Sequence, residues 1–390
     1  MFIKKGPIKK MSINNMSINQ LSQLQDTPSW SSRKTEVVCV GVIQETPDVK
    51  TFQFQSKSPQ LFHFKPGQFI GIQLEIDGEK HNRSYTIASS PSRPHILELT
   101  IKKEKGGSVS PWLHQNITVG SELELRGPAG RFNCFDIPSE KVLLISAGSG
   151  ITPMMSMARF WTDTDPSKDI QFLNWVRSVE DIIFRRELSL IDFKSENFQL
   201  EVNCTQPGLS ENWLGRRGRV NATSLSDMVT DLNDRVIFCC GPDGFMQQVK
   251  SCLESLNFNM ENYHDETFDP GGKKKAKLEQ QEKMLKEAPQ EVAQDTPQEI
   301  VPAGPFTLSL KQSNKTIVVE ENEILLEKLE SEGITIDTGC RAGNCGACMV
   351  KKISGETVTQ NDFGLQDSEK TQGYILTCTT RLESDVELDL

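Results

Sequence analysis

The chain of 390 residues exceeds the usual size of one domain, about 100 to 200 residues, so more than one hydrophobic core is expected. Hydrophobic residues make up 36% and charged residues 25%, as in ordinary folded proteins, and no apolar run approaches the roughly 20 residues that span a bilayer. The net charge of −10 gives no general attraction to nucleic-acid phosphates or anionic lipid. We therefore expect neither an integral membrane protein nor a nucleic-acid binder.

Ten cysteines without a secretory apolar segment favour a reducing compartment, where clustered thiols bind metal or react more often than they form disulfides. We therefore expect a cytoplasmic protein. Residues 1–34 begin with a few lysines and continue as Ser, Asn and Gln without an apolar core, so we interpret them as a polar N-terminal tail.

Residues 35–137 have the pattern of an antiparallel β-barrel or sandwich. Turn signals such as Lys65-Pro66-Gly67 and Asp77-Gly78 separate short runs of strand-forming residues. The expected strands lie at 37–40, 51–54, 69–74, 84–87 and 97–101.

Residues 138–269 change to buried strands that alternate with helices. Continuous apolar strands with crossover helices make a parallel sheet, so this segment is expected to be an α/β domain. The expected strands are 142–145, 170–173 and 236–239, and the helices following them begin at 153, span about 180–190 and span about 244–256.

Residues 270–304 consist largely of Lys, Glu, Gln, Pro and Ala, a composition that cannot bury enough apolar surface to fold. We expect a flexible linker that lets the following segment move. Residues 305–390 are expected to form a small α+β domain with strands at 306–310 and 316–320, a helix at 324–330, and strands near 349–351 and 386–388. This last segment carries 8 Lys and Arg against 15 Asp and Glu, which is −7 of the total −10.

Four cysteines form the strongest motif. Cys340, Cys345 and Cys348 have the spacing C-x4-C-x2-C, and Cys378 follows at a distance. This spacing is typical of plant-type [2Fe–2S] ferredoxins, whereas structural zinc uses paired short knuckles. Glycines and alanines between the cysteines leave room for a cluster and let backbone N–H groups point at sulfur. We predict that all four cysteines are ligands. The segment resembles a plant-type ferredoxin, which implies a β-grasp fold.

A second motif lies in the expected barrel. The run Arg83-Ser84-Tyr85-Thr86 is followed by Ile101-Lys102 and by Gly106-Gly107-Ser108-Val109-Ser110-Pro111. Ser110 can cap a helix, Pro111 suits its first position, and the glycines allow close approach to a phosphate. Arg83 offers a charge for a diphosphate and Tyr85 a ring face for a planar cofactor. Taken singly, each piece is equally consistent with an exposed strand.

A third motif, Gly148-Ser149-Gly150-Ile151-Thr152-Pro153, stands between an expected strand and a helix. The glycines permit a tight turn, Thr152 can cap the helix and Pro153 can begin it, with the helix N-terminus facing a nucleotide phosphate. The Pro departs from the G-x-G-x-x-G fingerprint, and no acidic residue ends the second strand as that fingerprint requires.

In this order the motifs resemble the ferredoxin–NADP reductase superfamily, and Cys240-Gly241-Pro242-Asp243-Gly244-Phe245-Met246 resembles the second nucleotide motif of that family. The resemblance implies an NAD(P)H-dependent oxidoreductase with FAD. It implies three catalytic residues: Thr86 near flavin N5, Cys240 beside the nicotinamide, and Glu266 near the flavin face.

The same resemblance implies the cofactor-binding residues. Arg83 is expected at the pyrophosphate and Tyr85 on the isoalloxazine. The flavin set is Arg83, Ser84, Tyr85, Thr86, Ile101, Lys102, Gly106, Gly107, Ser108, Val109, Ser110 and Phe268. The nucleotide set is Gly148, Gly150, Thr152, Pro153, Cys240, Gly241 and Pro242.

Residues 36–390 as a whole resemble bacterial NADH oxidoreductases that reduce the hybrid-cluster protein. They are also similar to reductase components of Rieske-type oxygenases, including the glycine-betaine demethylating kind. Both imply electron flow from NADH to FAD, to the [2Fe–2S] cluster and to a protein acceptor. The motifs do not separate the two families, and we take the hybrid-cluster protein reductase as the first prediction.

Two other functions stay open: a stand-alone flavin or ferric reductase, and a redox sensor or scaffold without turnover. NADPH would favour cations around its 2′-phosphate, and Arg177, Arg185 and Arg186 follow the second α/β strand. Similar NADH reductases also carry Arg at the position resembling Arg177, so we expect NADH rather than NADPH.

Overall fold

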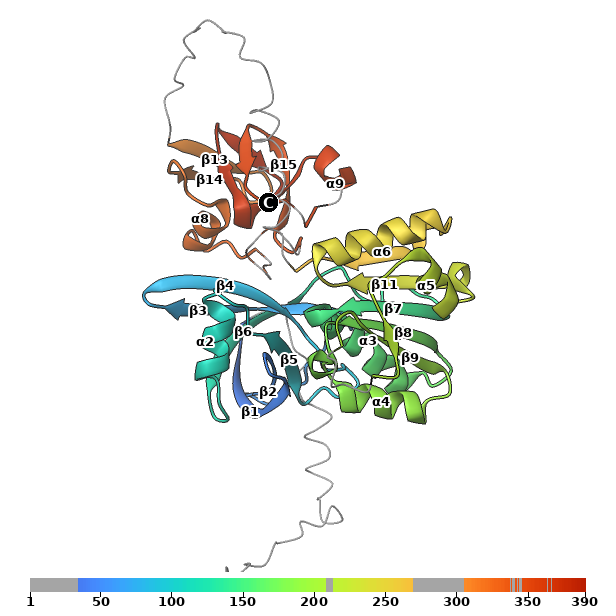
Figure 1. Cartoon of the computed structure of the whole chain (residues 1–390). Coiled ribbons are helices and arrows are strands. Elements are labelled where there is room, and N and C mark those ends of the chain that lie inside the picture. The colour runs from blue at the N-terminus through green and yellow to red at the C-terminus, as the bar shows by residue number, and fades with distance from the viewer. Residues whose placement is uncertain are drawn as a thin grey trace, which may run out of the picture.

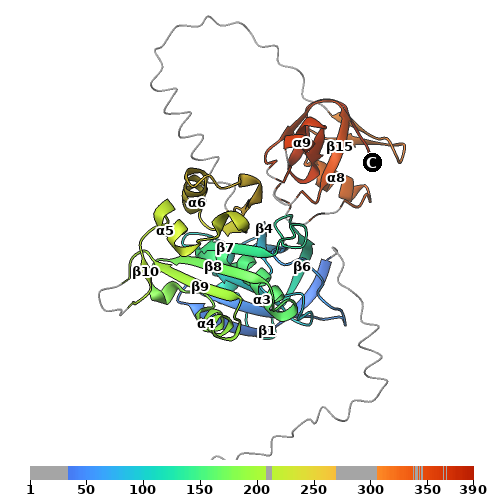
Figure 2. The ribbon, with the colours of Figure 1, turned by 90° about the vertical axis from the view of Figure 1, so that its right-hand side faces the viewer.

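The computed structural model describes residues 34–207, 213–268 and 305–390, except residues 337, 339, 340, 342, 344, 345, 363 and 366. The expected tail and linker therefore lie outside the described residues, apart from Lys34. The described chain forms two six-stranded sheets, one five-stranded sheet and one two-stranded sheet. In both views an N-terminal barrel lies beside a parallel sheet, and the C-terminal domain sits against the barrel (Figures 1 and 2). No described helix is long and apolar enough to cross a membrane.

The first sheet is antiparallel throughout and has the order β4-β3-β6-β1-β2-β5. A bridge between Ile87 and Leu99 joins its two edges and closes the barrel. Along the last strand Leu97, Leu99 and Ile101 alternate inward, as the side-chain period of two requires. The elements are β1 (Lys34–Thr46), β2 (Val49–Ser56), β3 (Phe69–Ile76), β4 (Glu79–Thr86), β5 (Leu97–Lys102), α2 (Val109–Asn116) and β6 (Glu122–Ala129).

The second sheet is parallel throughout and has the order β10-β9-β8-β7-β11-β12. Its strands are β7 (Lys141–Ala147), β8 (Asp169–Val176), β9 (Phe198–Cys204), β10 (Arg216–Arg217), β11 (Val236–Cys240) and β12 (Tyr263–Glu266). Its helices are α3 (Ile151–Thr164), α4 (Arg185–Lys194), α5 (Ala222–Met228) and α6 (Asp243–Ser255).

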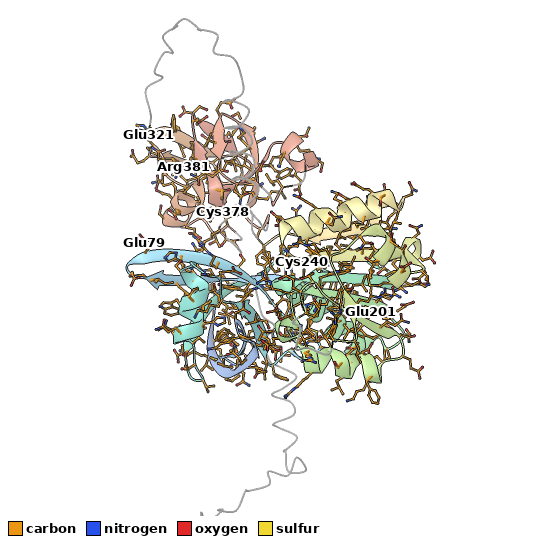
Figure 3. The ribbon with its side chains drawn as sticks, in the orientation of Figure 1. Glu79, Glu201, Cys240, Glu321, Cys378 and Arg381 are labelled. Carbon is orange, nitrogen blue, oxygen red and sulfur yellow. The ribbon has the colours of Figure 1, made fainter. Side chains whose placement is uncertain are left out.

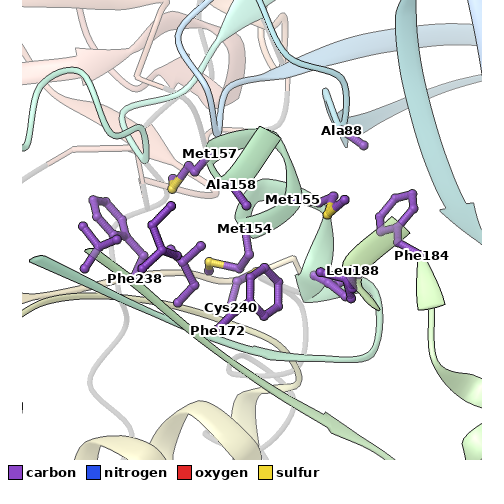
Figure 4. Packing of buried hydrophobic residues seen from close by; sticks show 14 of the residues in the cluster. Ala88, Met154, Met155, Met157, Ala158, Phe172, Phe184, Leu188, Phe238 and Cys240 are labelled. Atoms are coloured by element: carbon purple, nitrogen blue, oxygen red, sulfur yellow. The ribbon is translucent and has the colours of Figure 1, made fainter. Parts of the chain in front are cut away.

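Helices cover both faces of the parallel sheet, which explains the continuous apolar runs in its strands. On β7, Val142 and Leu144 face the cluster that contains α3 and α4, while Leu143 and Ile145 face the one that contains α5 and α6. Met154, Met155 and Met157 fill the first cluster together with Phe172 and Phe238 (Figure 4). The predicted α/β architecture is confirmed.

The C-terminal domain has a five-stranded sheet of order β14-β13-β19-β15-β17, in which β13 and β19 are parallel. Leu325 and Leu329 of α8 pack into the core beneath this sheet. The elements are β13 (Phe306–Leu310), β14 (Lys315–Val319), α8 (Leu325–Ser331), β15 (Met349–Ser354), β16 (Thr357–Thr359), α9 (Asp367–Thr371), β17 (Tyr374–Leu376), β18 (Thr380–Leu382) and β19 (Val386–Leu388).

A buried arginine joins the barrel to the parallel-sheet domain. Arg159 of α3 is 6% exposed. Its Nη1 donates to Glu98 Oε2 on β5 at 2.7 Å and to the Ala88 carbonyl at 2.7 Å. Its Nε and Nη2 donate to the two carboxylate oxygens of Glu187 on α4, at 2.8 and 2.6 Å. The guanidinium therefore ties together one barrel strand, the loop after β4 and two helices.

Arg159→Met should lower the free energy of unfolding by about 3 to 5 kcal/mol, because it leaves the largely buried Glu98 and the partly buried Glu187 without their cation. Arg93→Met is the matched control, since Arg93 also joins the barrel side to α3, through Asp163, but its side chain is 60% exposed. An exposed pair contributes less than about 1 kcal/mol. Urea unfolding followed by tryptophan fluorescence measures both variants, and equal losses would contradict the role assigned to Arg159.

Candidate functional site

Both predicted nucleotide motifs lie where the order of the parallel sheet reverses. β7 and β11 are adjacent, with Ser146 beside Cys240. The chain proceeds from β7 through β8 to β10 in one direction, and β11 and β12 lie on the other side. Crossovers leave in opposite directions at such a point, and they open a crevice at the carboxyl ends of the strands. Gly148 to Gly150 follows β7 and Gly241-Pro242 follows β11, so both loops lie at the carboxyl ends of these strands, where such sheets bind ligands.

The two loops are in close backbone contact. A Cβ on Gly150 would lie 2.2 Å from the Cys240 carbonyl oxygen and 2.6 Å from the Gly241 nitrogen. Gly148 has φ +56°, in the left-handed region. Glycine is therefore required at position 150 by the approach of the neighbouring loop, and at position 148 it provides the turn.

The start of the following helix differs from the sequence prediction. A 3₁₀ turn covers Gly148–Gly150, and α3 begins at Ile151 with Gly150 as its N-cap. The Thr152 hydroxyl donates to the Ser149 carbonyl at 3.0 Å and caps no backbone N–H. Pro153 is the third helical residue, not the first. It is tolerated there because N–H groups of the first turn have no intrahelical acceptor.

Cys240 and Glu266 are register partners on β11 and β12. Cys240 is fully buried, and burial raises the pKa of its thiol well above the usual value. Burial also raises the pKa of Glu266 to about 8, and its Oε2 atom is buried without a hydrogen-bond partner in the described part of the chain. The Glu266 carboxyl is therefore mostly neutral at pH 7. Figure 3 shows Cys240 near the junction of barrel, parallel sheet and C-terminal domain.

The segment after Glu266 is tied to the start of α6. Thr267 Oγ1 donates to Asp243 Oδ1 at 2.7 Å. Phe268 follows and is 43% exposed, so part of its ring is accessible to a stacking partner.

The expected flavin residues of β4 pair in register with β3. Tyr85 lies opposite Ile70, Arg83 opposite Ile72 and Thr86 opposite Phe69. Tyr85 packs against the barrel core, and burial raises its pKa to about 12, so its hydroxyl stays protonated. Arg83 and its neighbour Ser84 are exposed, whereas Thr86 is buried.

The glycine turn of the barrel is open. Gly106 has φ +80° and a Cβ placed on it would meet nothing within 4 Å, and Gly107 and Ser108 are also exposed. The bridge between Ile87 and Leu99 sets the end of β4 beside β5, so the turn that follows β5 is near the predicted flavin residues of β4.

The helix after this turn also starts earlier than predicted. α2 begins at Val109, with Ser108 as its N-cap. Ser110 Oγ accepts from the Glu104 N–H at 2.9 Å, so it fixes the turn and does not cap the helix, and Pro111 is the third helical residue. Ile101 belongs to the barrel core, and the Lys102 ammonium lies 3.5 Å from an Asp48 carboxylate oxygen.

Cys348 and Cys378 are buried together in one apolar cluster with Leu326, Leu365 and Leu376. Cys340 and Cys345 lie outside the described residues. Thr377 donates to the Cys348 carbonyl from both its N–H and its hydroxyl, each at 3.2 Å, and so fixes one cysteine relative to the other. Sequence reasoning did not find Thr377, although its position beside Cys378 was a signal.

The loop between the cysteines is held by close backbone contacts. Gly343 and Gly346 have φ +74° and +72°. A Cβ on Gly343 would lie 2.3 Å from the Asn361 carbonyl oxygen, and one on Gly346 would lie 2.7 Å from that of Gly364. Gly343 and Gly346 therefore approach Asn361 and Gly364 at distances that only glycine allows.

The cysteine loop also contacts the barrel. Ala347 packs against Phe69 and Ala129. Arg131, just after β6, donates from both Nη atoms to the two carboxylate oxygens of Glu369 on α9, at 3.0 and 2.9 Å. Because Phe69 is the register partner of Thr86, the cysteine loop lies one strand away from the residue expected at flavin N5. Sequence reasoning missed this contact, since its two charged residues are 238 positions apart.

The described residues fit the implied groups. The open turn at Gly106 and the exposed Arg83 suit the diphosphate of a flavin nucleotide. The unpartnered Glu266 Oε2 offers a polar contact to a bound ring. Two buried thiols beneath a glycine-rich loop suit an iron–sulfur cluster.

Gly150→Ala should raise the Kd for NAD⁺ at least about tenfold, or about 1.4 kcal/mol, because the methyl group overlaps the Cys240 carbonyl and forces the two loops apart. Gly244→Ala is the matched control, since a Cβ there meets nothing within 4 Å. Titration calorimetry gives both constants. An unchanged Kd for Gly150→Ala would show that the crevice does not depend on this contact.

Glu266→Gln should flatten the pH dependence of stability in the flavin-free protein. Glu266 titrates near pH 8 when folded and at about 4.5 when unfolded, so stability falls as pH rises between these values, by up to about 1.4 kcal/mol per pH unit. The amide removes this fall. Melting temperatures across pH 5 to 8 test it, with the exposed Glu261→Gln as control. Parallel pH profiles for Glu266→Gln and the unmodified protein would rule out the raised pKa.

Three family models match the chain in sequence order. The oxidoreductase FAD-binding domain matches residues 38–134, the oxidoreductase NAD-binding domain residues 144–251, and the 2Fe-2S iron-sulfur cluster binding domain residues 308–383. The predicted FAD, NADH and [2Fe–2S] cofactors are confirmed, and so is the predicted class of oxidoreductase.

The chain is 41% identical to a glycine betaine monooxygenase reductase subunit from Pseudomonas aeruginosa, over 93% of this chain and 97% of that protein. It is 28% identical to NADH oxidoreductase HCR of Escherichia coli, over 89% of this chain and 95% of that protein. The crystal structure of phthalate dioxygenase reductase shares the fold, with a TM-score of 0.55 at 20% identity, over 92% of this chain and 98% of that one.

All three match nearly the whole length of this chain, across the flavin, nucleotide and ferredoxin family models. A protein acceptor for the electrons follows from the reductase role of such relatives. The chain therefore belongs to the ferredoxin–NADP reductase superfamily, among the reductases in which a plant-type [2Fe–2S] ferredoxin domain follows the nucleotide domain, and it transfers electrons from NADH through FAD to that cluster.

Proposed function

We propose that this chain is the reductase component of a Rieske-type oxygenase that demethylates glycine betaine or a closely related quaternary ammonium compound. The observation that carries this proposal is the 41% identity to the glycine betaine monooxygenase reductase subunit along nearly the whole of both chains. The hybrid-cluster protein, which the sequence prediction ranked first, has the support of a relative at 28% identity. The higher identity favours an oxygenase as the acceptor.

When bound, FAD accepts two electrons from NADH as hydride, and the [2Fe–2S] cluster carries them onward singly. The protein supplies the geometry for this exchange. We propose that the loops after β7 and β11 receive the nucleotide in the crevice, with Cys240 beside the nicotinamide. Their backbone contact at Gly150 fixes the width of that crevice.

Glu266 is proposed to face the flavin with a neutral carboxyl. Its pKa of about 8 keeps the proton on the group at pH 7, so it can donate a hydrogen bond while adding no negative charge beside the hydride acceptor. The Glu266 Oε2 atom is available for this hydrogen bond, because it is buried without a partner among the described residues.

On the barrel, the exposed guanidinium of Arg83 and the open turn from Gly106 to Ser110 are proposed to hold the flavin diphosphate. Tyr85 would pack on the isoalloxazine and Thr86 would stand near N5. Phe268 would cover the flavin from the nucleotide side. The remaining predicted flavin contacts, Ser84, Ile101 and Lys102, keep the same proposed roles.

All four cysteines, Cys340, Cys345, Cys348 and Cys378, are proposed as cluster ligands. The burial of Cys348 and Cys378 in one apolar cluster supports this for two of them. The domain boundaries given above and the cytoplasmic location remain predictions.

The test is a reconstitution of the holoprotein with candidate acceptors. With the oxygenase component of the Pseudomonas aeruginosa glycine betaine monooxygenase, we expect NADH oxidation that depends on glycine betaine and consumes oxygen. The Cys378→Ser variant should still bleach its flavin with NADH but should support at least about 100-fold less acceptor turnover, because the path to the acceptor is broken. Anaerobic NADH titration followed by EPR confirms the state of the cluster.

A hybrid-cluster protein serves as the competing acceptor in the same assay. Faster reduction of that protein, with no betaine-dependent oxidation through the oxygenase, would overturn the proposal. Full betaine-dependent turnover by Cys378→Ser would show instead that electrons leave from the flavin, as in a stand-alone flavin reductase.

A further inference from the structure

A bidentate ion pair joins the ferredoxin domain to the barrel. Arg131 Nη1 lies 3.0 Å from Glu369 Oε2, and Arg131 Nη2 lies 2.9 Å from Glu369 Oε1. Arg131 follows β6 of the barrel and Glu369 lies on α9 of the ferredoxin domain. Two parallel N–H···O bonds fix orientation as well as distance, which a single bond from a lysine would not do.

The same guanidinium lies directly on the cysteine loop. Arg131 Nη2 and Nε are 3.2 and 3.3 Å from the position of a Cβ on Gly346, and Nη2 is 3.9 Å from Met349 Sδ. Gly346 stands between Cys345 and Cys348. A side chain at position 346 would push the arginine away, so the glycine serves this contact as well as the turn of the loop.

An apolar contact completes the interface. Ala347 packs on Phe69 and Ala129, where a small side chain lets the loop approach the barrel. Phe69 is paired with Thr86 on β4. The contact therefore places the cysteine loop over the part of the barrel where the reactive end of the flavin is proposed to lie. In Figure 3 Cys378 is labelled at the edge of the ferredoxin domain that faces β4.

The ion pair between Arg131 and Glu369 is weak enough to form and break reversibly. The Arg131 side chain is 45% exposed and that of Glu369 is 18% exposed, so solvent and salt screen the pair. The ferredoxin segment carries a net charge of −7, and Arg131 gives the barrel a matching cation at the point of contact. Charge complementarity of this kind speeds association more than it strengthens the complex.

We propose that Arg131 is a positioning residue that docks the ferredoxin domain reversibly, by holding Glu369 and the Gly346 turn so that the cluster loop lies over β3 and β4. Each NADH supplies two electrons, which pass to the ferredoxin domain one at a time while it is docked and leave to the acceptor as two single-electron reductions. Only the expected effect on the rate of cluster reduction rests on the proposed function, in which Cys348 is a cluster ligand. The docking itself does not depend on that role.

The experiment uses the full-length holoprotein with Arg131→Glu, Glu369→Arg and the double charge exchange. Lys57→Glu is the control for the barrel, since Lys57 pairs with Glu36 and Glu122 away from the interface. Glu332→Arg is the control for the ferredoxin domain, where Glu332 pairs with Lys315 and Lys328. Each protein is measured at low and at high salt.

Two readouts separate docking from electron transfer. Hydrogen exchange, followed by mass spectrometry before NADH is added, reports the protection of residues 128–135 and 365–373. Stopped-flow mixing with NADH then reports flavin bleaching and cluster reduction as separate phases. We expect each single reversal to speed exchange in both segments and to slow cluster reduction about tenfold, with flavin bleaching unchanged.

The double exchange should recover the cluster-reduction rate to within about threefold of the original, since the ion pair is restored with reversed sign. If the double exchange restored hydrogen-exchange protection but not the rate of cluster reduction, the ion pair would be the docking contact, but the docking would have no role in electron transfer. The docking role would be overturned if the single reversals gave the same hydrogen exchange and the same rate of cluster reduction as Lys57→Glu and Glu332→Arg. It would also be overturned if the double exchange restored neither the protection nor the rate. None of these outcomes depends on the identity of the acceptor.

Discussion

The buried guanidinium of Arg159 is the interaction on which the arrangement of the two larger domains depends. Hydride transfer requires the reacting atoms to be held at contact distance, so a flavin on the barrel and a nucleotide in the parallel sheet need a fixed junction. Arg159 provides it by binding Glu98 of the barrel and Glu187 of α4 at once. The surrounding core is continuous across the junction, since Val49 and Phe132 of the barrel side pack with Met154 of α3. The two domains therefore share one buried junction.

Close backbone contact is the second constraint, and it recurs at both ends of the electron path. Gly150 is pressed against the Cys240 carbonyl, and Gly343 is pressed against that of Asn361. In each place a loop that we propose holds a cofactor or nucleotide contacts the backbone of another segment at a distance that excludes any side chain. The glycines of these motifs thus serve the packing of the protein as well as access for the bound group.

The periodicity of the sequence predicted five of the six barrel strands and the longer helices, because local apolar patterns determine those elements. In the two larger domains it missed α5 and the strands β6, β9, β10 and β12. Polar residues such as Asn203 in β9 and His264 in β12 break the apolar run. The nucleotide loops follow β7 and β11, as the sequence pattern predicted, but the exact helix starts at Ile151 and Val109 did not follow from capping preferences. The geometry of the preceding turns determines where these two helices begin. Long-range pairs such as Arg159 with Glu98 leave no local signal, since burial and partner choice arise only in the folded chain.

The burial of each interdomain arginine matches the kind of electron transfer that takes place across its junction. Arg159 is buried and bound to two carboxylates, and it serves a two-electron hydride step that tolerates little movement. Arg131 is half-exposed and bound to one carboxylate, and it serves single-electron steps that must reach first the flavin and then an external acceptor. A junction as strong as that of Arg159 would hold the cluster away from the acceptor, whereas no junction would leave its encounter with the flavin to chance. An exposed, bidentate, salt-sensitive pair satisfies both demands, because its geometry is specific while its net stability is small.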